Sequence, residues 1–313
     1  MPGALPTYAV VTPVRDEADH FARTADSMVG QTHRPLQWVI VDDGSTDGTR
    51  ELADSYAQRH HWIEVISAES SHERARGAPI VRAFQRGYDA LGQRPDVVVK
   101  LDGDLFLPPH YFEWVAATFA RDQRAGIVGG VALIPEDGRW VPERVNLLNV
   151  NGVAKAYRVA CLDDIGGLRQ SMGWDGIDEY GARARGWHVR VLTELTMLHY
   201  RPRGSKQKAL KARWEEGRGN AYMGYLPSWL LVRAVYRSFV EKPPIVGGLA
   251  LFAGYAWARI RRLPQIDDEA ARAELRAEQR ARLSGLFRGR TAPALAESDG
   301  GGPAYWATGS DDS

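Results

Sequence analysis

Residues 97–104 read VVVKLDGD, in which an apolar run is followed at once by two carboxylates one position apart. Val97 to Leu101 predicts a buried strand, because β-branched side chains suit a pleated, packed surface. Asp102 and Asp104 are unsuited to a core, and carboxylate oxygens are the ligands that Mg²⁺ and Mn²⁺ prefer, often shared with substrate phosphates. Gly103 lets the backbone approach a ligand closely. The stretch therefore predicts a cation site at the end of a strand.

Strands and helical segments alternate before this stretch. Earlier strands are predicted over residues 8–13, 36–41 and 63–66. Each is followed by apolar residues at helical spacing, which predicts an α/β fold with a mainly parallel sheet and helices on both faces. Ligands of such sheets bind at the carboxyl ends of the strands. Residues 13–17, 42–45 and 102–104 follow three of these ends, so we expect them to converge.

The later part of the chain has a different pattern. Further strands are predicted over residues 127–133, 153–158 and 189–192. From about Lys206 the sequence becomes helical and basic, and residues 270–283 predict a charged helix. The glycine-rich and acidic tail from about residue 290 is expected to be disordered.

Composition limits the class of protein. The chain has 313 residues, 44% hydrophobic and 25% charged, with a net charge of +1, so no overall field favours nucleic acid as a partner. The single cysteine, Cys161, excludes an internal disulfide and is expected to be a core residue in a reducing compartment. The first residues lack the charge and apolar run of a secretory signal. We therefore expect a cytoplasmic protein.

One apolar segment, residues 245–258, leaves two interpretations open. It is shorter than the ~20 residues that a spanning helix needs. Lys242 precedes it, and Arg259, Arg261 and Arg262 follow it. Basic flanks around a short apolar helix are typical of a segment that lies in the inner face of a membrane. The alternative is a buried helix of a small C-terminal subdomain.

The turn after the first strand, Thr12 to Glu17, contains no glycine. It therefore lacks the G-x-G-x-x-G pattern of dinucleotide oxidoreductases and the glycine-rich loop of P-loop kinases and ATPases.

At this point the chain resembles the GT-A glycosyltransferases of the large inverting family 2. The resemblance is carried, in order, by residues 11–17, 31–32, 39–49, 83–87, 100–104, 173–179 and 199–201. It implies a GT-A nucleotide-diphospho-sugar transferase fold with a C-terminal helical extension. Residues 1–205 would be the catalytic domain, with a nucleotide-binding half (1–104) and an acceptor half (105–205). Residues 206–288 would be a helical, membrane-associating region, and residues 289–313 a disordered tail.

The resemblance also implies ligands and roles. The partners would be a nucleotide-diphosphate sugar donor and a glycan or lipid-linked acceptor, and the cofactor Mn²⁺ or Mg²⁺. The donor nucleotide would be bound by Thr12, Pro13, Arg15, Glu17, Asp42, Asp43, Arg82 and Asp102. The metal would be held by Asp104 and His199, with Asp102 facing it or the ribose. An acid at 42 or 43 could instead cap the next helix.

An inverting transfer needs a carboxylate that takes a proton from the acceptor hydroxyl. Counting back from Gly186-Trp187 to the family's Glu-Asp pair assigns the base to Asp175, with Asp178 as second candidate, and puts Trp174 where the family has Glu. Trp174 could stack on a sugar ring, and Glu179 could contact the acceptor. The acids could also be solvated residues at a helix N-terminus.

Other readings of the same residues remain. Gln85 stands where the family usually has Asn, and Lys206, Lys208 and Arg213 could cover the diphosphate, rest on lipid or form a solvated face. A nucleotidyltransferase would need a glycine-rich loop after the first strand, which is absent. A non-catalytic sugar-nucleotide-binding partner with the same fold is the second alternative.

Overall fold

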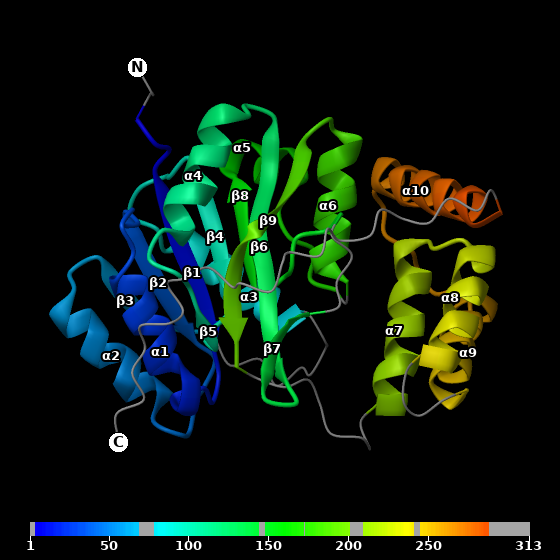
Figure 1. The fold of residues 1–313 in the computed structure, drawn as a ribbon, viewed down its shortest axis with the longest axis horizontal. Helices are drawn as coiled ribbons and strands as arrows, with labels where there is room; N and C mark the ends of the chain where they lie inside the picture. The colour runs from blue at the N-terminus through cyan, green and yellow to red at the C-terminus, as the bar shows by residue number, and fades with distance from the viewer. Residues whose placement is uncertain are drawn as a thin grey trace.

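The structure is a computed structural model that describes residues 4–68, 78–143, 148–171, 173–200, 209–240 and 245–287. Lys206, Lys208 and the tail from residue 289 lie outside these ranges. A nine-stranded sheet runs through the molecule in the order β3-β2-β1-β4-β8-β6-β9-β5, with β7 paired to β6 (Figure 1). The strands are β1 (Tyr8–Val14), β2 (Gln37–Asp42), β3 (Ile63–Ser67), β4 (Val97–Leu101), β5 (Leu105–Phe106), β6 (Ala125–Glu136), β7 (Arg139–Pro142), β8 (Ala154–Arg158) and β9 (His188–His199).

The parallel half of the sheet is the one predicted from the first hundred residues. β1 pairs in parallel with β2 and β4, and β2 pairs in parallel with β3. Their carboxyl ends therefore lie along one edge, as the alternation of strands and helices requires.

The second half is mixed, so the expectation of a mainly parallel sheet holds only for the nucleotide-binding half. β8 runs antiparallel to both β4 and β6, while β9 is parallel to β6. The pair β6–β7 is a hairpin whose turn residues Asp137 and Gly138 have φ of 50° and 74°. An Asp-Gly turn of this kind closes antiparallel strands, and it separates the second half from the βαβ pattern.

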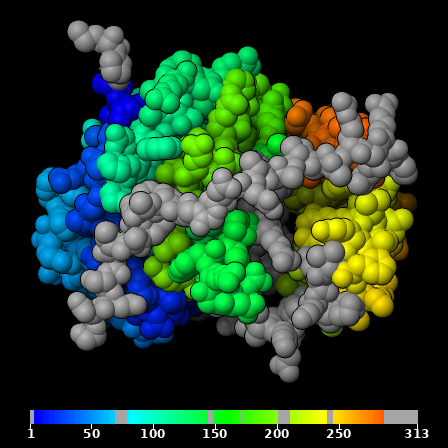
Figure 2. Space-filling view, viewed as in Figure 1, coloured from blue at the N-terminus to red at the C-terminus, as the bar shows by residue number. Residues whose placement is uncertain are grey.

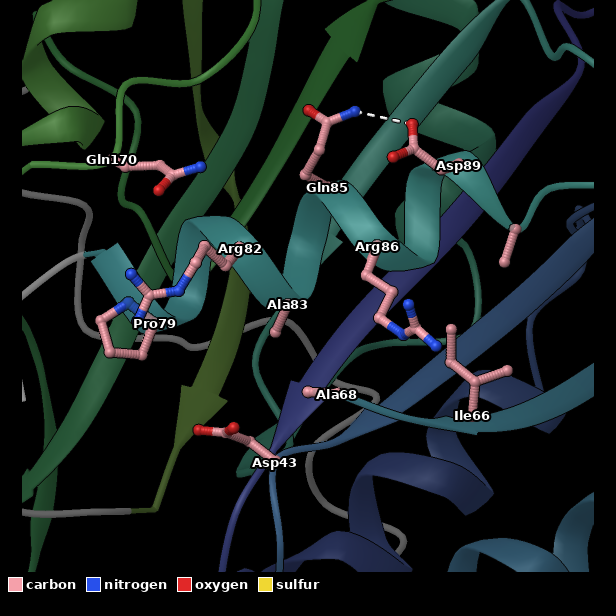
Figure 3. Close-up of a pocket in the computed structure, with 11 residues that line it drawn as sticks. Asp43, Ile66, Ala68, Pro79, Arg82, Ala83, Gln85, Arg86, Asp89 and Gln170 are labelled. Carbon is pink, nitrogen blue, oxygen red and sulfur yellow. Dashed lines mark hydrogen bonds between the residues drawn. The ribbon is translucent and has the colours of Figure 1, made fainter. Parts of the chain in front are cut away.

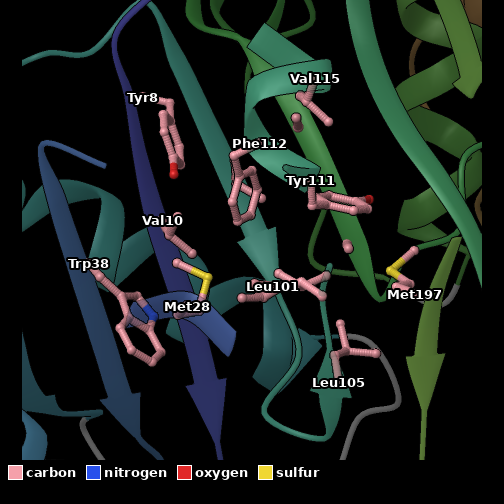
Figure 4. Close-up of a cluster of buried hydrophobic side chains, with 14 of the residues drawn as sticks. Tyr8, Val10, Met28, Trp38, Leu101, Leu105, Tyr111, Phe112, Val115 and Met197 are labelled. Carbon is pink, nitrogen blue, oxygen red and sulfur yellow. The ribbon is translucent and has the colours of Figure 1, made fainter. Parts of the chain in front are cut away.

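Helices cover both faces of the sheet. They are α1 (Ala18–Val29), α2 (Thr49–Arg59), α3 (Ala78–Asp89), α4 (Tyr111–Arg121), α5 (Val159–Asp164) and α6 (Trp174–Ala184). One core lies between the sheet and α1, α2 and α4, and Figure 4 shows part of it around Trp38, Leu101 and Phe112. The other lies under α3, α5 and α6 and includes the fully buried Cys161, as expected for a core cysteine.

Four further helices form the predicted C-terminal extension: α7 (Ala209–Met223), α8 (Pro227–Val240), α9 (Val246–Ile260) and α10 (Glu269–Phe287). They stand beside α6 in Figure 1. α7 and α9 touch through glycines, since a Cβ at Gly217 would lie 2.0 Å from the Leu251 carbonyl oxygen. α10 packs on α6 through Ile177, Tyr180 and Leu275. None of the helices in the described ranges has the length and hydropathy to cross a bilayer.

Candidate functional site

The ends of β1, β2 and β4 meet, as predicted. A Cβ at Gly103 would lie 3.0 Å from Val14 Cγ1 and 3.6 Å from Glu17 Cγ, so the turn after β4 packs directly on the turn after β1. The Asp43 amide donates to the Val14 carbonyl oxygen at 2.9 Å. Arg15 Nη1 lies 3.5 Å from Asp43 Oδ2. A side chain at 103 would have to displace Val14 by a few tenths of an ångström, so glycine suits this close contact.

The two acids after β2 have different surroundings. Asp42 is buried, and its Oδ1 accepts the Ser45 amide at 3.1 Å, so it holds the turn that leads to α2. Asp42 does not cap α2, whose N-cap is Gly48 without a side-chain hydrogen bond. Asp43 has a side chain that is 23% exposed and lines a pocket. Of the two, Asp43 is the one that a nucleotide could reach.

The pocket beside Asp43 has a volume of about 670 Å³ and lies between α3 and the end of β3 (Figure 3). Asp43 and Arg82 line it together with Gln85. Arg86 Nε donates to the Ser67 carbonyl oxygen at 2.8 Å and so fixes α3 against β3. The pocket thus offers a carboxylate and a guanidinium to a polar ligand.

Thr12 does not line this pocket, contrary to expectation. Its side chain is fully buried, and its Oγ1 accepts a hydrogen bond from Trp38 Nε1 at 2.9 Å. Side chains alternate along a strand, and those of Val10, Thr12 and Val14 point to the face opposite α3. Pro13, the next residue, is partly exposed.

The acids after β4 lie beside the end of β9. β5 pairs with β9 so that Leu105 is opposite His199. His199 Nε2 is 3.4 Å from Asp104 Oδ2, and both side chains are less than 10% exposed. Burial alone would lower the pKa of His199, but the Asp104 carboxylate raises it above its usual value. Asp104 and His199, which were predicted to share a site, are therefore close in space although they are 95 residues apart in the sequence.

The donor set can be compared with what Mn²⁺ or Mg²⁺ needs. Within the described part of the chain, no three His, Cys, Asp or Glu side chains are placed so that they could hold a metal ion by themselves. Asp102 turns one carboxylate oxygen to the Lys100 ammonium. The buried Nδ1 of His199 makes no hydrogen bond with the described residues. Mg²⁺ often takes only one or two carboxylates from a protein and the rest from phosphates and water, so the neighbouring pair Asp104 and His199 fits an ion that a diphosphate completes.

Two buried lysines lie behind these acids, and neither was assigned a role from the sequence. Lys100 and Lys155 are opposite one another in the antiparallel pair β4–β8. Their Nζ atoms lie 5.5 Å and 5.8 Å from the centre of the Trp174 ring. Trp174 is only 7% exposed, so its ring does not offer an open surface for the sugar stacking expected of it. The indole instead lies against two cations, a favourable contact for an aromatic face.

Asp178 and Glu179 are the counter-charges of Lys155. Lys155 Nζ is 3.0 Å from Asp178 Oδ2 and 2.9 Å from Glu179 Oε1, and all three side chains are at most 1% exposed. Asp178 also accepts the Tyr157 hydroxyl. Burial would lower the pKa of Lys155, but the carboxylates raise it above its ordinary value. Both acids are buried and engaged by Lys155, and this position does not support the roles expected for them as base and acceptor contact.

Asp175 is the exposed acid of this region. It lies in the first turn of α6, which begins after Gly173 with φ of 83°. A Cβ at Gly152 would be 3.2 Å from Asp175 Oδ2, and the Gly152 carbonyl oxygen accepts Lys100 Nζ at 2.8 Å. The Lys100 ammonium also binds the Asp102 carboxylate. It therefore links Asp102 to Gly152, which lies against the Asp175 side chain. The solvated Asp175 carboxylate therefore lies across from Asp102 and Asp104, the two acids that follow β4.

Replacing Lys155 by methionine should lower the free energy of unfolding by about 3–5 kcal/mol, because it leaves two buried carboxylates without their cation. Urea unfolding followed by tryptophan fluorescence measures the loss. The exposed Lys211→Met is the matched control and should change stability by less than about 0.5 kcal/mol. A triple variant that also carries Asp178→Asn and Glu179→Gln should recover part of the loss. Unchanged stability in Lys155→Met would contradict the pairing.

Comparisons with known proteins agree with this geometry. Residues 9–158 match the profile of a family described as glycosyl transferase family 2. The putative teichuronic acid biosynthesis glycosyltransferase TuaG of Bacillus subtilis is 34% identical over 77 residues, which are 25% of this chain and 29% of TuaG. The chain spans less than half the length of the curated relatives it matches.

Solved structures share the fold at low identity. TarS 1–349 of S. aureus in complex with UDP-GlcNAc aligns with a TM-score of 0.55 and 17% identity, over 92% of this chain and 93% of that one. Mannosyltransferase PcManGT from Pyrobaculum calidifontis in complex with GDP-Man and Mn²⁺ aligns with a TM-score of 0.54 and 16% identity, over 92% and 83%. These likenesses confirm the GT-A fold expected from the sequence.

Proposed function

Because the chain belongs to glycosyl transferase family 2 through residues 9–158, we propose that it is an inverting glycosyltransferase. It moves a sugar from a nucleoside diphosphate donor to a hydroxyl acceptor in glycan biosynthesis. One observation carries this proposal: Asp43, Asp102 and Asp104 follow strands of one sheet edge, and the exposed Asp175 stands across from them.

The donor nucleotide binds along the edge formed by the ends of β1 and β2. Asp43 accepts hydrogen bonds from the base, and Arg82 on α3 faces the same pocket. Arg15, paired with Asp43, holds that carboxylate in place. Pro13 and Glu17 border the nucleotide from the turn after β1. The identity of the base then depends on a few contacts in the pocket, since small differences in hydrogen bonding discriminate strongly.

The diphosphate binds at the end of β4. Asp104 and His199, whose side chains lie 3.4 Å apart, would hold a divalent cation there, and Asp102 would face it or the ribose. When bound, the cation neutralises the charge that develops on the leaving diphosphate. The Lys100 ammonium fixes the orientation of Asp102 through a direct ion pair and a second bond to the Gly152 carbonyl oxygen.

The acceptor hydroxyl approaches from the side of α6. Asp175 takes its proton as the hydroxyl oxygen forms a bond to the anomeric carbon, and the bond from that carbon to the phosphate oxygen breaks on the opposite side. Asp175 suits this role better than Asp178, because its side chain is exposed and Asp178 is held by Lys155 and Tyr157. The acceptor is a glycan or a lipid-linked sugar, and the reaction takes place on the cytoplasmic side.

A binding screen tests the donor site. Among nucleoside diphosphates offered with Mn²⁺ or Mg²⁺, at least one base should raise the thermal midpoint, because a ligand at 100 times its Kd stabilises the native state by about 2.7 kcal/mol. Asp43→Ala should abolish the shift. Asp54→Ala removes an acid whose ion pair with Arg50 lies on the surface of α2, and it should keep the shift. A screen without any stabilising diphosphate would count against the proposal, and binding without turnover would favour the non-catalytic alternative.

A further inference from the structure

Helices α8 and α9 carry an apolar surface that no described residue covers. On α8 it consists of Leu231, Val235 and Phe239, and on α9 of Val246, Leu249 and Ile260; we call these six residues the α8–α9 face. Phe239 is 81% exposed, Ile260 79% and Leu249 63%. The spacing of three, four or eleven residues keeps each set on one side of its helix. Figures 1 and 2 show both helices at the end of the molecule remote from α2.

The two stripes meet where the end of α8 contacts the start of α9. The Ile245 amide donates to the Ser238 carbonyl oxygen at 2.9 Å, which brings the end of α8 to the start of α9. A Cβ at Gly248 would lie 2.3 Å from the Ala234 carbonyl oxygen, so the helices touch backbone to backbone. Phe239 and Val246 therefore belong to one surface.

The opposite side of α9 is already used. Gly254 meets α7, since a Cβ there would be 2.1 Å from the Trp214 carbonyl oxygen. Leu251 and Tyr255 are buried in the same subdomain. One side of α9 is therefore core, and the other is an apolar surface without a protein neighbour among the described residues.

Charge selects the kind of partner. Residues 227–262 contain six basic residues and one acidic residue, Glu241. Arg233 and Arg237 bind Glu216 of α7. Arg259, Arg261 and Arg262 are exposed at the end of α9, next to Ile260. An apolar surface with an exposed aromatic residue and a basic edge is typical of an element that lies in the headgroup region of an anionic bilayer.

From this arrangement we infer that the α8–α9 face docks on the surface of an anionic lipid bilayer. The apolar side chains enter the boundary between headgroups and acyl chains, and the three arginines contact lipid phosphates. The helices lie on the membrane and do not cross it, in keeping with their length. This surface is separate from the donor pocket, so the inference does not depend on the transfer reaction.

Co-sedimentation of the full chain with vesicles tests the inference. The wild-type protein should bind vesicles of phosphatidylcholine with 30% phosphatidylglycerol, and binding should weaken with salt because charge attraction is screened. The double variant Phe239→Ser/Leu249→Ser should bind about 100-fold more weakly. Arg259→Gln/Arg261→Gln should lose about 30-fold on anionic vesicles. Both pairs are exposed, so circular dichroism and the thermal midpoint should stay unchanged.

A matched control is Trp114→Ser, which removes an aromatic residue that is 50% exposed on α4. It should bind as the wild type does. Equal binding of the wild type to pure phosphatidylcholine would overturn the role of charge. Vesicle binding that survives Phe239→Ser/Leu249→Ser would overturn the inference. It would also be overturned if the wild type formed a stable dimer without binding vesicles, and if the same double variant were a monomer. Since the readout is binding, a failure here is distinct from a failure of the transferase proposal.

Discussion

Asp175→Asn is expected to reduce turnover about 10²–10⁴-fold while the affinity for the donor stays unchanged, because asparagine cannot accept the proton of the attacking hydroxyl. The measurement is release of nucleoside diphosphate from the sugar nucleotide that the binding screen identifies, with water as the acceptor. Water must lose a proton in the same way as a sugar hydroxyl, so the assay reports on the base before the natural acceptor is known.

Two further variants make the result specific for Asp175. Asp137→Asn changes an exposed acid in the β6–β7 turn, where asparagine tolerates the positive φ of 50°, and it should keep full turnover. Asp178→Asn should lower stability more than turnover per folded molecule, because it removes a partner of Lys155. Full turnover in Asp175→Asn would exclude it as the base.

Asp104→Asn should reduce turnover by about 10²–10³-fold, which corresponds to the several kcal/mol that a cation contributes at a leaving diphosphate. Its separate signature is metal binding. Mn²⁺ titrated into the wild-type protein with a nucleoside diphosphate should show a saturable site by electron paramagnetic resonance, and the variant should lack it.

The control for this variant is Glu136→Gln at the exposed end of β6, which should bind Mn²⁺ normally. Retention of a saturable Mn²⁺ site by Asp104→Asn would remove that residue from the cation site. Normal metal binding with lost turnover would instead indicate that Asp104 acts on the sugar.

The parallel half of the sheet could be predicted because its signals are local. Each strand there is a short apolar run, and each acid or turn residue follows directly, so position in the sequence translates into position at the sheet edge. The approach of Asp104 to His199 was also predicted, although only through the resemblance to a family. The pair Asp137-Gly138 between β6 and β7 is a further local signal, because Asp-Gly is typical of hairpin turns.

The buried charges could not be predicted, because they depend on pairing between distant segments. Lys100 and Lys155 become neighbours only through the antiparallel register of β4 and β8. That register in turn decides that Trp174 lies over two cations and that Asp178 points inward. A lysine inside the apolar run VVVKL was the available clue, since an unpaired cation in a buried strand would be costly.

The counter-charges of Lys155 have a consequence for grafting experiments. The segment that matches the family profile ends at Arg158, but Asp178 and Glu179 lie beyond it, on α6. If a segment that ended at residue 158 were transplanted into another scaffold, the buried Lys155 ammonium would lose both of its carboxylate partners. Swapping sugar-nucleotide preference between relatives therefore requires a cut after α6, and the partners of α6 on α10 must come from the same parent.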